Sequence, residues 1–141
     1  MKTSLVPGLK HTGALIVLPS MTVPEVCPEL SEFADMPPVF ATAMMVGFIE
    51  ATCIACIAAH LDEGEHSVGT DINVSHVAAT PIGMKVRAEV ILTHVEKRML
   101  TFTVEAFDNA GLIGKGSHKR AIIDKERFNA KVKEKAMGGA G

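Results

Sequence analysis

A single carboxylate, Glu50, stands inside a long apolar stretch of this chain. The run from Met36 to Ala59, MPPVFATAMMVGFIEATCIACIAA, contains no other charged residue. Burying an unpaired charge costs on the order of several kcal/mol unless a partner or a proton neutralises it. We therefore interpret Glu50 as the centre of a functional site.

A histidine is the second unusual residue. Alternation along a strand expected at 68–80 places His76 on the same inward face as Ile72 and Val74. A lone inward histidine is more often a hydrogen-bonded core residue than a catalyst. If the helix carrying Glu50 packs against this strand, however, the carboxylate and the imidazole each supply the partner that the other lacks. A structural ion pair satisfies the same pattern, so pairing alone does not decide.

Two small residues flank Glu50 on its helical face. Gly47 lies three residues before it and Cys53 three residues after it, and positions with this spacing are neighbours on a helix. A glycine in a helix interior costs about 1 kcal/mol relative to alanine, so Gly47 suits the close approach of a ligand or another backbone. Tight packing of helix on sheet explains Gly47 equally well.

Thr42 is the third candidate, and helix geometry constrains it. Eight residues of a straight helix separate two groups by about 12 Å, so Thr42 and Glu50 cannot touch on one regular segment. Either the helix begins after Thr42, or Thr42 serves a site that a second subunit completes. A threonine near a helix start is otherwise interpreted as a cap.

Charge and cysteine content limit the possible partners. A net charge of -2 from 14 basic and 16 acidic residues argues against binding to nucleic acid or to an anionic membrane. The chain has an odd number of cysteines, Cys27, Cys53 and Cys56. This number favours reduced thiols and a cytoplasmic location. No second pair of ligands accompanies the two helical cysteines, so we expect neither a metal nor a cofactor.

The remaining pattern predicts one strand, one long helix, four more strands and a last helix within a single domain of residues 1–141. The apolar helix at 39–60 has the length of a membrane span, but the alternating strands after it favour a core helix instead. The segment 19–38, punctuated by prolines, is expected to be a long loop that acts as a lid, with Val23, Phe33 and Met36 among its apolar residues. The expected bounds are 11–18 for the first strand, 68–80, 84–94, 100–108 and 112–123 for the later strands, and 124–135 for the last helix.

This order of elements is typical of the α+β hot-dog fold, in which an antiparallel sheet wraps around one long central helix. A single sheet leaves an unpaired edge, so we expect a homodimer joined edge to edge. The other fold considered is a cone-shaped α+β barrel, which usually has more helices before its sheet.

Three segments resemble the hot-dog acyl-CoA thioesterases of the fluoroacetyl-CoA thioesterase type. They read CPELSEFADMPPVFATAMMVGFIEATC, SVGTDINVSHVAATP and GKGSHKRAIIDKERFNAKV. The resemblance spans roughly residues 15 to 132 and implies a catalytic triad of Thr42, Glu50 and His76. It also implies that Gly69 and Arg120 lie at the substrate.

One position departs from the family pattern. The family's fluoroacetyl-specific enzyme has an aromatic lid residue just before a proline, whereas this chain has Met36 before Pro37. Phe33 in the lid is retained. A flexible thioether seals a pocket of different shape, so discrimination for a fluorinated acyl group does not follow from the resemblance.

The implied reaction is hydrolysis of a short acyl-CoA thioester to a carboxylate and free coenzyme A. Glu50 either attacks the carbonyl or activates water, and His76 orients Glu50 or transfers protons. The Thr42 hydroxyl and the backbone N–H near Gly69 are candidate donors to the developing oxyanion. Arg120 binds the pantetheine or a phosphate in this interpretation, or else lies on a solvated strand face. A hot-dog hydratase and a non-catalytic acyl-CoA binding module are the alternatives, because fold alone does not fix function.

Overall fold

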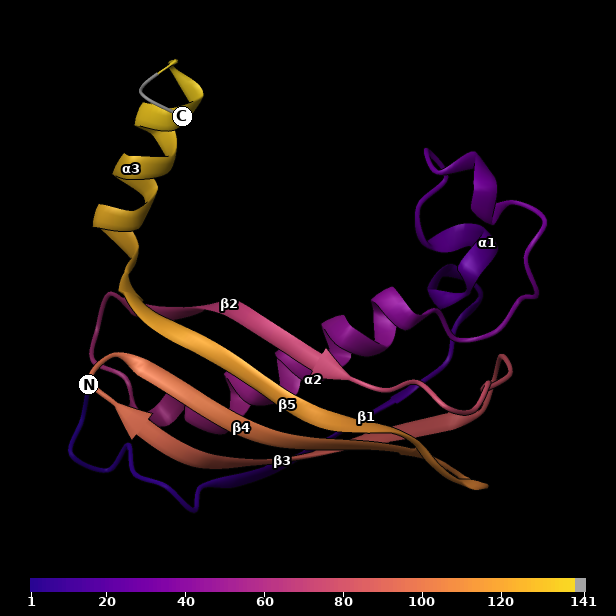
Figure 1. Cartoon of the computed structure of the whole chain (residues 1–141), viewed down its shortest axis with the longest axis horizontal. Helices are drawn as coiled ribbons and strands as arrows, with labels where there is room; N and C mark the ends of the chain where they lie inside the picture. Colours follow the sequence, from indigo (N-terminus) through magenta and orange to yellow (C-terminus); the bar gives the residue numbers. More distant parts are fainter. Residues whose placement is uncertain (139–141) are drawn as a thin grey trace.

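The computed structural model describes residues 1–138 of the chain. A curved sheet lies against one long helix, and short helical turns precede that helix (Figure 1). The strands are β1 (Lys10–Ile16), β2 (Glu65–Val74), β3 (Lys85–Glu96), β4 (Met99–Asp108) and β5 (Gly111–Asp124). The helices are η1 (Pro19–Met21), α1 (Val23–Val26), η2 (Ser31–Phe33), α2 (Thr42–Ile57), η3 (Ala58–His60) and α3 (Lys125–Ala136).

The five strands form one antiparallel sheet in the order β1-β3-β4-β5-β2. The two middle strands alternate between buried and exposed side chains, as the sequence predicted. Their inner faces consist of Val86, Ala88, Val90 and Leu92 on β3 and Leu100, Phe102, Val104 and Ala106 on β4. A sheet wrapped around one helix confirms the predicted hot-dog fold.

Only one face of α2 is covered. Its buried residues recur every three or four positions and pack against the sheet, whereas Ala51 and Ile54 on the other side are exposed although they are apolar. The segment Thr42–His60 has the length and hydropathy of a membrane span, and 39% of that window is buried inside the protein. The expected core helix is therefore covered on one face only in the single chain. The buried set is Met45, Phe48, Ile49, Thr52, Cys53, Cys56 and Ile57.

The edge strand β2 differs most from expectation. It ends at Val74, so His76 lies in the loop that follows and not on a strand face. Ile72 lies opposite the buried His118 and so shares the inner face, as expected, although it is 42% exposed. The pairing of β2 with β5 shifts register between Gly69 and Asp71, and this bulge places Gly69, opposite Arg120, on the inner face as well.

The segment before α2 is not a plain loop. It contains η1, α1 and η2, and its apolar residues Leu30 and Met36 are 45% and 49% exposed. We refer to residues 23–36 as the lid. In Figure 1 the lid stands out from the body at the end where α2 begins.

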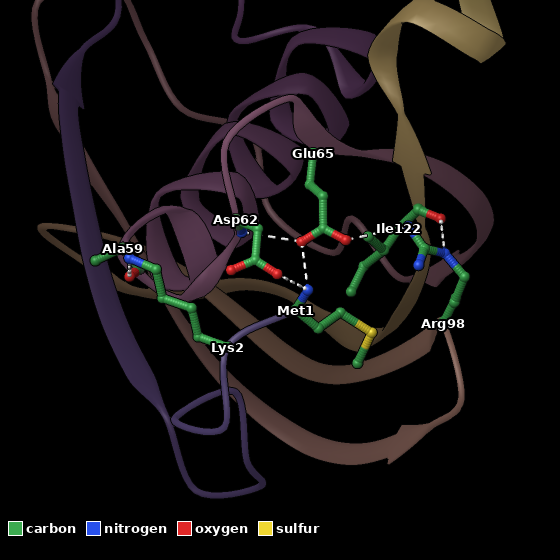
Figure 2. A network of polar contacts seen from close by, with 7 residues as sticks. All are labelled: Met1, Lys2, Ala59, Asp62, Glu65, Arg98 and Ile122. Carbon is green, nitrogen blue, oxygen red and sulfur yellow. Dashed lines mark hydrogen bonds and ion pairs between the residues drawn. The ribbon is translucent and has the colours of Figure 1, made fainter.

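Polar contacts fasten the other end of α2. The α-ammonium of Met1 forms ion pairs with Asp62 and Glu65, and Arg98 binds Glu65 through its guanidinium (Figure 2). The hydrogen bond from the ammonium to Glu65 is the main cause that lowers the pKa of this carboxylate. The turn that leads from α2 to β2 is thereby fixed at the end opposite the lid.

The charged C-terminal helix predicted at 124–135 is confirmed as α3. Asp124 caps it by accepting a hydrogen bond from the backbone N–H of Arg127, a typical arrangement for a helix start. None of its residues is buried, and it projects away from the sheet (Figure 1).

Candidate active site

Glu50 is held by Arg120 from β5. Nη1 of Arg120 donates to Oε2 of Glu50 at 2.7 Å. The Arg120 side chain is buried, whereas that of Glu50 is 37% exposed, so the carboxylate is not sealed in the core as the sequence suggested. It faces a 440 Å³ depression between α2 and the strands β2 and β5. The lining residues are Val46, Glu50, Gly69, Thr70, Asp71, Ile72 and His118.

Arg120 is itself fixed by strand β2. Its Nε donates to the Ser67 hydroxyl at 2.8 Å, and its Nη2 donates to the Ser67 carbonyl oxygen at 2.9 Å. Charge-assisted bonds of this kind are about twice as strong as neutral ones. The guanidinium therefore reaches Glu50 from a defined position, and it is not on the solvated strand face considered above.

His118 belongs to the same cluster, although the sequence did not predict it as a site residue. Its ring lies 2% exposed, with Nδ1 2.7 Å from the carbonyl oxygen of Asp71 and Nε2 3.1 Å from Nη1 of Arg120. A carbonyl only accepts, so Nδ1 carries the proton and Nε2 accepts from Arg120. The available signal was strand alternation, because residues 118 and 120 of one strand share a face.

Gly69 makes room for the carboxylate. A Cβ at this position would lie 2.6 Å from Oε2 of Glu50 and 3.3 Å from Cε1 of His118. Its backbone is not among the positive-φ glycines of the described chain. The requirement for glycine is therefore space beside Glu50 and not a backbone conformation reserved for glycine.

Thr42 and His76 form a second cluster. The Thr42 hydroxyl lies 2.7 Å from Nδ1 of His76. Because α2 begins at Thr42 with Ala41 as its N-cap residue, the threonine is not the cap. Burial lowers the pKa of His76, partly offset by the backbone of Ala78. Its Nε2 is the one buried side-chain nitrogen or oxygen atom without a hydrogen-bond partner among residues 1–138.

The second cluster borders its own pocket of 300 Å³. Val23 from the lid lines it, together with Val39, Phe40 and residues 77–79, while Phe33 and Met36 do not. The pocket of Glu50 and the pocket of His76 share no lining residue.

Within one chain the two clusters stay apart. Thr42 and Glu50 are eight residues apart on the same helix, which corresponds to about 12 Å. The predicted contact between Glu50 and His76 is therefore wrong inside a single chain, where Arg120 and Thr42 are their partners instead. Of the two alternatives for Thr42, the one in which the helix begins later is excluded, because α2 includes it.

The small neighbours of Glu50 have different surroundings. A Cβ at Gly47 would meet no atom within 4 Å, so no close approach occurs there within the chain. Cys53 is fully buried, and burial raises the pKa of its thiol to about 12, which makes it a poor nucleophile. No group of three metal-ligating side chains gathers anywhere in residues 1–138.

A buried polar pair supports the loop that carries His76. The Thr80 hydroxyl donates to Oδ2 of Asp108 at 2.7 Å, and Oδ1 of Asp108 accepts from the backbone N–H of Ala110 and of Gly111. The Thr80 carbonyl oxygen accepts from the N–H of Phe40, next to the start of α2. The loop and the helix start are thus tied to the β4–β5 turn.

Comparison with known proteins defines the class of protein. A thioesterase superfamily member from Thermus thermophilus superposes with a TM-score of 0.82 at 29% identity, over 96% of this chain and 98% of that chain. A hot-dog-like protein from Thermanaerovibrio acidaminovorans, 22% identical over 92% of this chain and 91% of that one, shares the fold with a TM-score of 0.77. The chain is a hot-dog thioesterase.

More similar relatives define the family. Residues 17–126 match the family described as fluoroacetyl-CoA-specific thioesterase. The fluoroacetyl-CoA thioesterase of Streptantibioticus cattleyicolor is 45% identical over 139 residues, which cover 99% of this chain and all of that protein. A crystal structure of the fluoroacetyl-CoA thioesterase FlK has a TM-score of 0.91 at 45% identity, over 94% of this chain and 98% of that chain. A threonine-to-serine mutant of that enzyme was solved in complex with acetyl-CoA.

The chain belongs to the fluoroacetyl-CoA-specific thioesterase family, as the three sequence segments predicted. It is an acyl-CoA thioester hydrolase, so the predicted enzyme class is confirmed. Neither the hydratase nor the binding module gains support from these relatives.

Proposed function

We propose that the protein hydrolyses a short acyl-CoA thioester in an active site that two copies of the chain share. One copy supplies Glu50 with Gly69 and Arg120, and the other supplies Thr42 and His76. The observation that carries the proposal is the incompleteness of each half: Glu50 faces an open pocket, and Nε2 of His76 is buried without a partner.

Edge pairing of β2 is the proposed route to the homodimer. β2 hydrogen-bonds to β5 on one side only, and unpaired strand edges readily accept a second strand. Antiparallel pairing of β2 with its copy places the start of one strand beside the end of the other. Because His76 follows the end of β2 and Gly69 lies within it, this pairing brings the His76 loop of one copy toward the Glu50 pocket of the other.

The proposed chemistry uses the free oxygen of Glu50. Arg120 binds Oε2, so Oε1 is left to attack the thioester carbonyl or to take a proton from an attacking water. When water attacks, the proton taken up by Glu50 passes by way of neutral His76 to the coenzyme A thiolate as the C–S bond breaks. When Glu50 attacks, breakage of the C–S bond leaves a mixed anhydride, which water hydrolyses while His76 takes a proton from that water and passes it to the thiolate. The Thr42 hydroxyl and a backbone N–H near Gly69 are the proposed donors to the oxyanion.

The lid sets the proposed acyl selectivity. Val23 lines the pocket beside His76, and Phe33 and Met36 follow in the same segment. We propose that these three residues close over a short acyl group when the two copies assemble. The Met36 thioether adapts to several shapes, so we expect weaker discrimination between fluorinated and plain acetyl groups than an aromatic lid residue would provide.

Free cysteines favour a cytoplasmic location for the enzyme, and we propose one thioesterase domain over residues 1–141. No membrane or nucleic acid has a place in this function.

Exchange between two inactive variants tests the shared site. Glu50→Gln and His76→Ala are mixed, partly unfolded and refolded, and thiol release is measured with acetyl-, fluoroacetyl-, propionyl- and butyryl-CoA. A shared site places both substitutions in one site of each mixed dimer and leaves the other intact, so activity returns to about a quarter of the wild-type level. No recovery although mixed dimers form would show that each site lies within one chain. Tight binding without thiol release from wild type would favour the binding module.

A further inference from the structure

We propose that His118 is a positioning residue for Glu50, acting through Arg120. The inference rests on the proposed role of Glu50 as the reacting carboxylate. His118 does not touch Glu50 within hydrogen-bond distance, since its Nε2 lies 3.9 Å from Oε2. Its influence therefore passes through the guanidinium.

The ring acts as a fixed acceptor. The Asp71 carbonyl oxygen, 2.7 Å from Nδ1, holds the proton on that nitrogen and leaves a lone pair on Nε2. Nη1 of Arg120 carries two hydrogens, of which one is directed to Glu50 at 2.7 Å and the other to Nε2 at 3.1 Å. Because both hydrogens have acceptors, rotation of the guanidinium breaks two bonds at once.

Packing keeps the ring in this orientation. His118 is 2% exposed, and its ring stacks on Phe102 with a centroid distance of 6.4 Å. The missing Cβ of Gly69, which would lie 3.3 Å from Cε1 of the ring, leaves the approach to Glu50 open. A lysine or a bare apolar residue at 118 would offer Arg120 no acceptor.

The consequence is a connection from the edge strand to the carboxylate. Ser67 holds Arg120 directly, and Asp71 holds it through His118, so two residues of β2 fix one guanidinium. The same strand is the proposed dimer edge. Ordering of β2 by a second copy would therefore also fix the position of Glu50.

Two substitutions at the same site separate positioning from packing. His118→Gln can place its amide oxygen near the position of Nε2, whereas His118→Asn reaches only the position of Nδ1 and keeps the contact with Asp71. Both remove the stacked ring. A misplaced catalytic group costs about 10- to 100-fold in rate, so we expect kcat to fall at least about 10-fold in His118→Asn and clearly less in His118→Gln. KM should change less than about threefold in both, because the ring is 2% exposed and presents little surface to the pocket.

A double-mutant cycle with Arg120→Lys tests the route. If His118 acts through the guanidinium, His118→Asn lowers kcat far less in the Arg120→Lys background than in wild type. Equal effects in the two backgrounds, or equal kcat in the Gln and Asn variants at equal Tm, would overturn the proposal.

A measurement without turnover keeps this test separate from the proposed function. In the long-range ¹H–¹⁵N NMR spectrum of the wild-type protein at pH 7.5, His118 should show a protonated Nδ1 and an unprotonated Nε2, and Arg120→Lys should shift the Nε2 signal. The opposite tautomer would refute the acceptor role whether or not the enzyme is active. If His118 shows the expected tautomer but the protein releases no thiol from any acyl-CoA, the proposed function is refuted while the acceptor role of His118 is retained.

Discussion

The two halves of the proposed site differ in how completely their own chain supports them. Arg120 holds Oε2 of Glu50, and Ser67 and His118 in turn hold Arg120. His76 has one side-chain contact, to Thr42, and a buried Nε2 with none. The first half is built on regular strands and a helix, the second on a loop and a helix start. Groups on regular elements are positioned in advance, whereas the loop half is left for a second copy or a substrate to complete.

The Glu50 half should show the largest effect of substitution. Glu50→Gln keeps the size of the side chain and an oxygen that can accept from Arg120, but it removes the charge needed for attack or proton transfer. We expect kcat to fall at least about 100-fold, measured as thiol release from the best acyl-CoA of the panel. Tm within a few degrees of wild type serves as the folding control. Near-wild-type turnover would remove Glu50 from the chemistry.

His76→Ala should lower turnover by a similar factor of at least about 100. Burial lowers the pKa of His76 below its ordinary value of 6.5, so the ring is neutral at pH 7 and gains its proton only in more acidic solution. If the neutral ring is the form that begins the reaction, kcat/KM of the wild-type enzyme should fall as the pH drops below 6.5 and should be constant above it. An acid limb centred above pH 7 would contradict this role.

Gly69→Ala tests whether crowding the Glu50 carboxylate lowers turnover as much as removing a catalytic side chain does. The added methyl would lie 2.6 Å from Oε2 of Glu50, so the carboxylate or Arg120 must move. We expect a fall in kcat of about 10- to 100-fold with little loss of stability, because Glu50 is part-exposed and can turn outward. Gly47→Ala, at a position open in the chain, is the matched control. Unchanged kcat in Gly69→Ala would mean that the position of Oε2 does not matter.

Thr42→Ala should be milder than the changes to Glu50 and His76. The hydroxyl is one of several donors proposed for the oxyanion, and a single donor is usually supplemented by others. We expect a reduction of about 10-fold in kcat, with Thr42→Ser close to wild type because it retains the bond to His76. Complete loss of activity in Thr42→Ala would assign it a larger role than a shared donor.

The sequence predicted the site residues Glu50 and His76 more readily than the side chains to which they hydrogen-bond. An acid alone in an apolar run identified Glu50, and strict alternation identified the inner faces of β3 and β4. The pairing of Glu50 with Arg120 joins residues 70 positions apart, and no local pattern reports such a contact. The bulge between Gly69 and Asp71 places Gly69 opposite Arg120 on the inner face together with Ile72 and Val74, whereas strict alternation assigned Gly69 to the outer face, because one extra residue changes which side chains point inward. His118 was hidden between Lys115 and Lys119, whose charges suggested a solvated face.

Asp108 is a further residue whose distant partner could not be predicted from the sequence. The sequence placed it at the end of a strand expected at 100–108, whereas the structure adds Thr80 as a partner and so connects the β4–β5 turn to the His76 loop. Burial raises the pKa of Asp108, but the hydrogen bonds from Thr80 and from the N–H groups of Ala110 and Gly111 outweigh it and bring the pKa below its ordinary value of 3.8. The carboxylate therefore stabilises the fold above pH 3.8, and this contribution is lost as the pH falls through the lowered pKa.

Asp108→Asn should have the smallest effect on turnover and a measurable one on stability. Hydrogen bonds to a charged group contribute about 1.5–3 kcal/mol, and asparagine retains part of them, so we expect a loss of about 1 kcal/mol at pH 7 in urea unfolding. The difference from wild type should shrink as the pH is lowered below 3.8, where both side chains become neutral. Because the loop carries His76 but not Glu50, any change in kcat should vanish in the His76→Ala background and persist in Glu50→Gln. A pH-independent difference in stability would show that the charge of Asp108 does not support the loop.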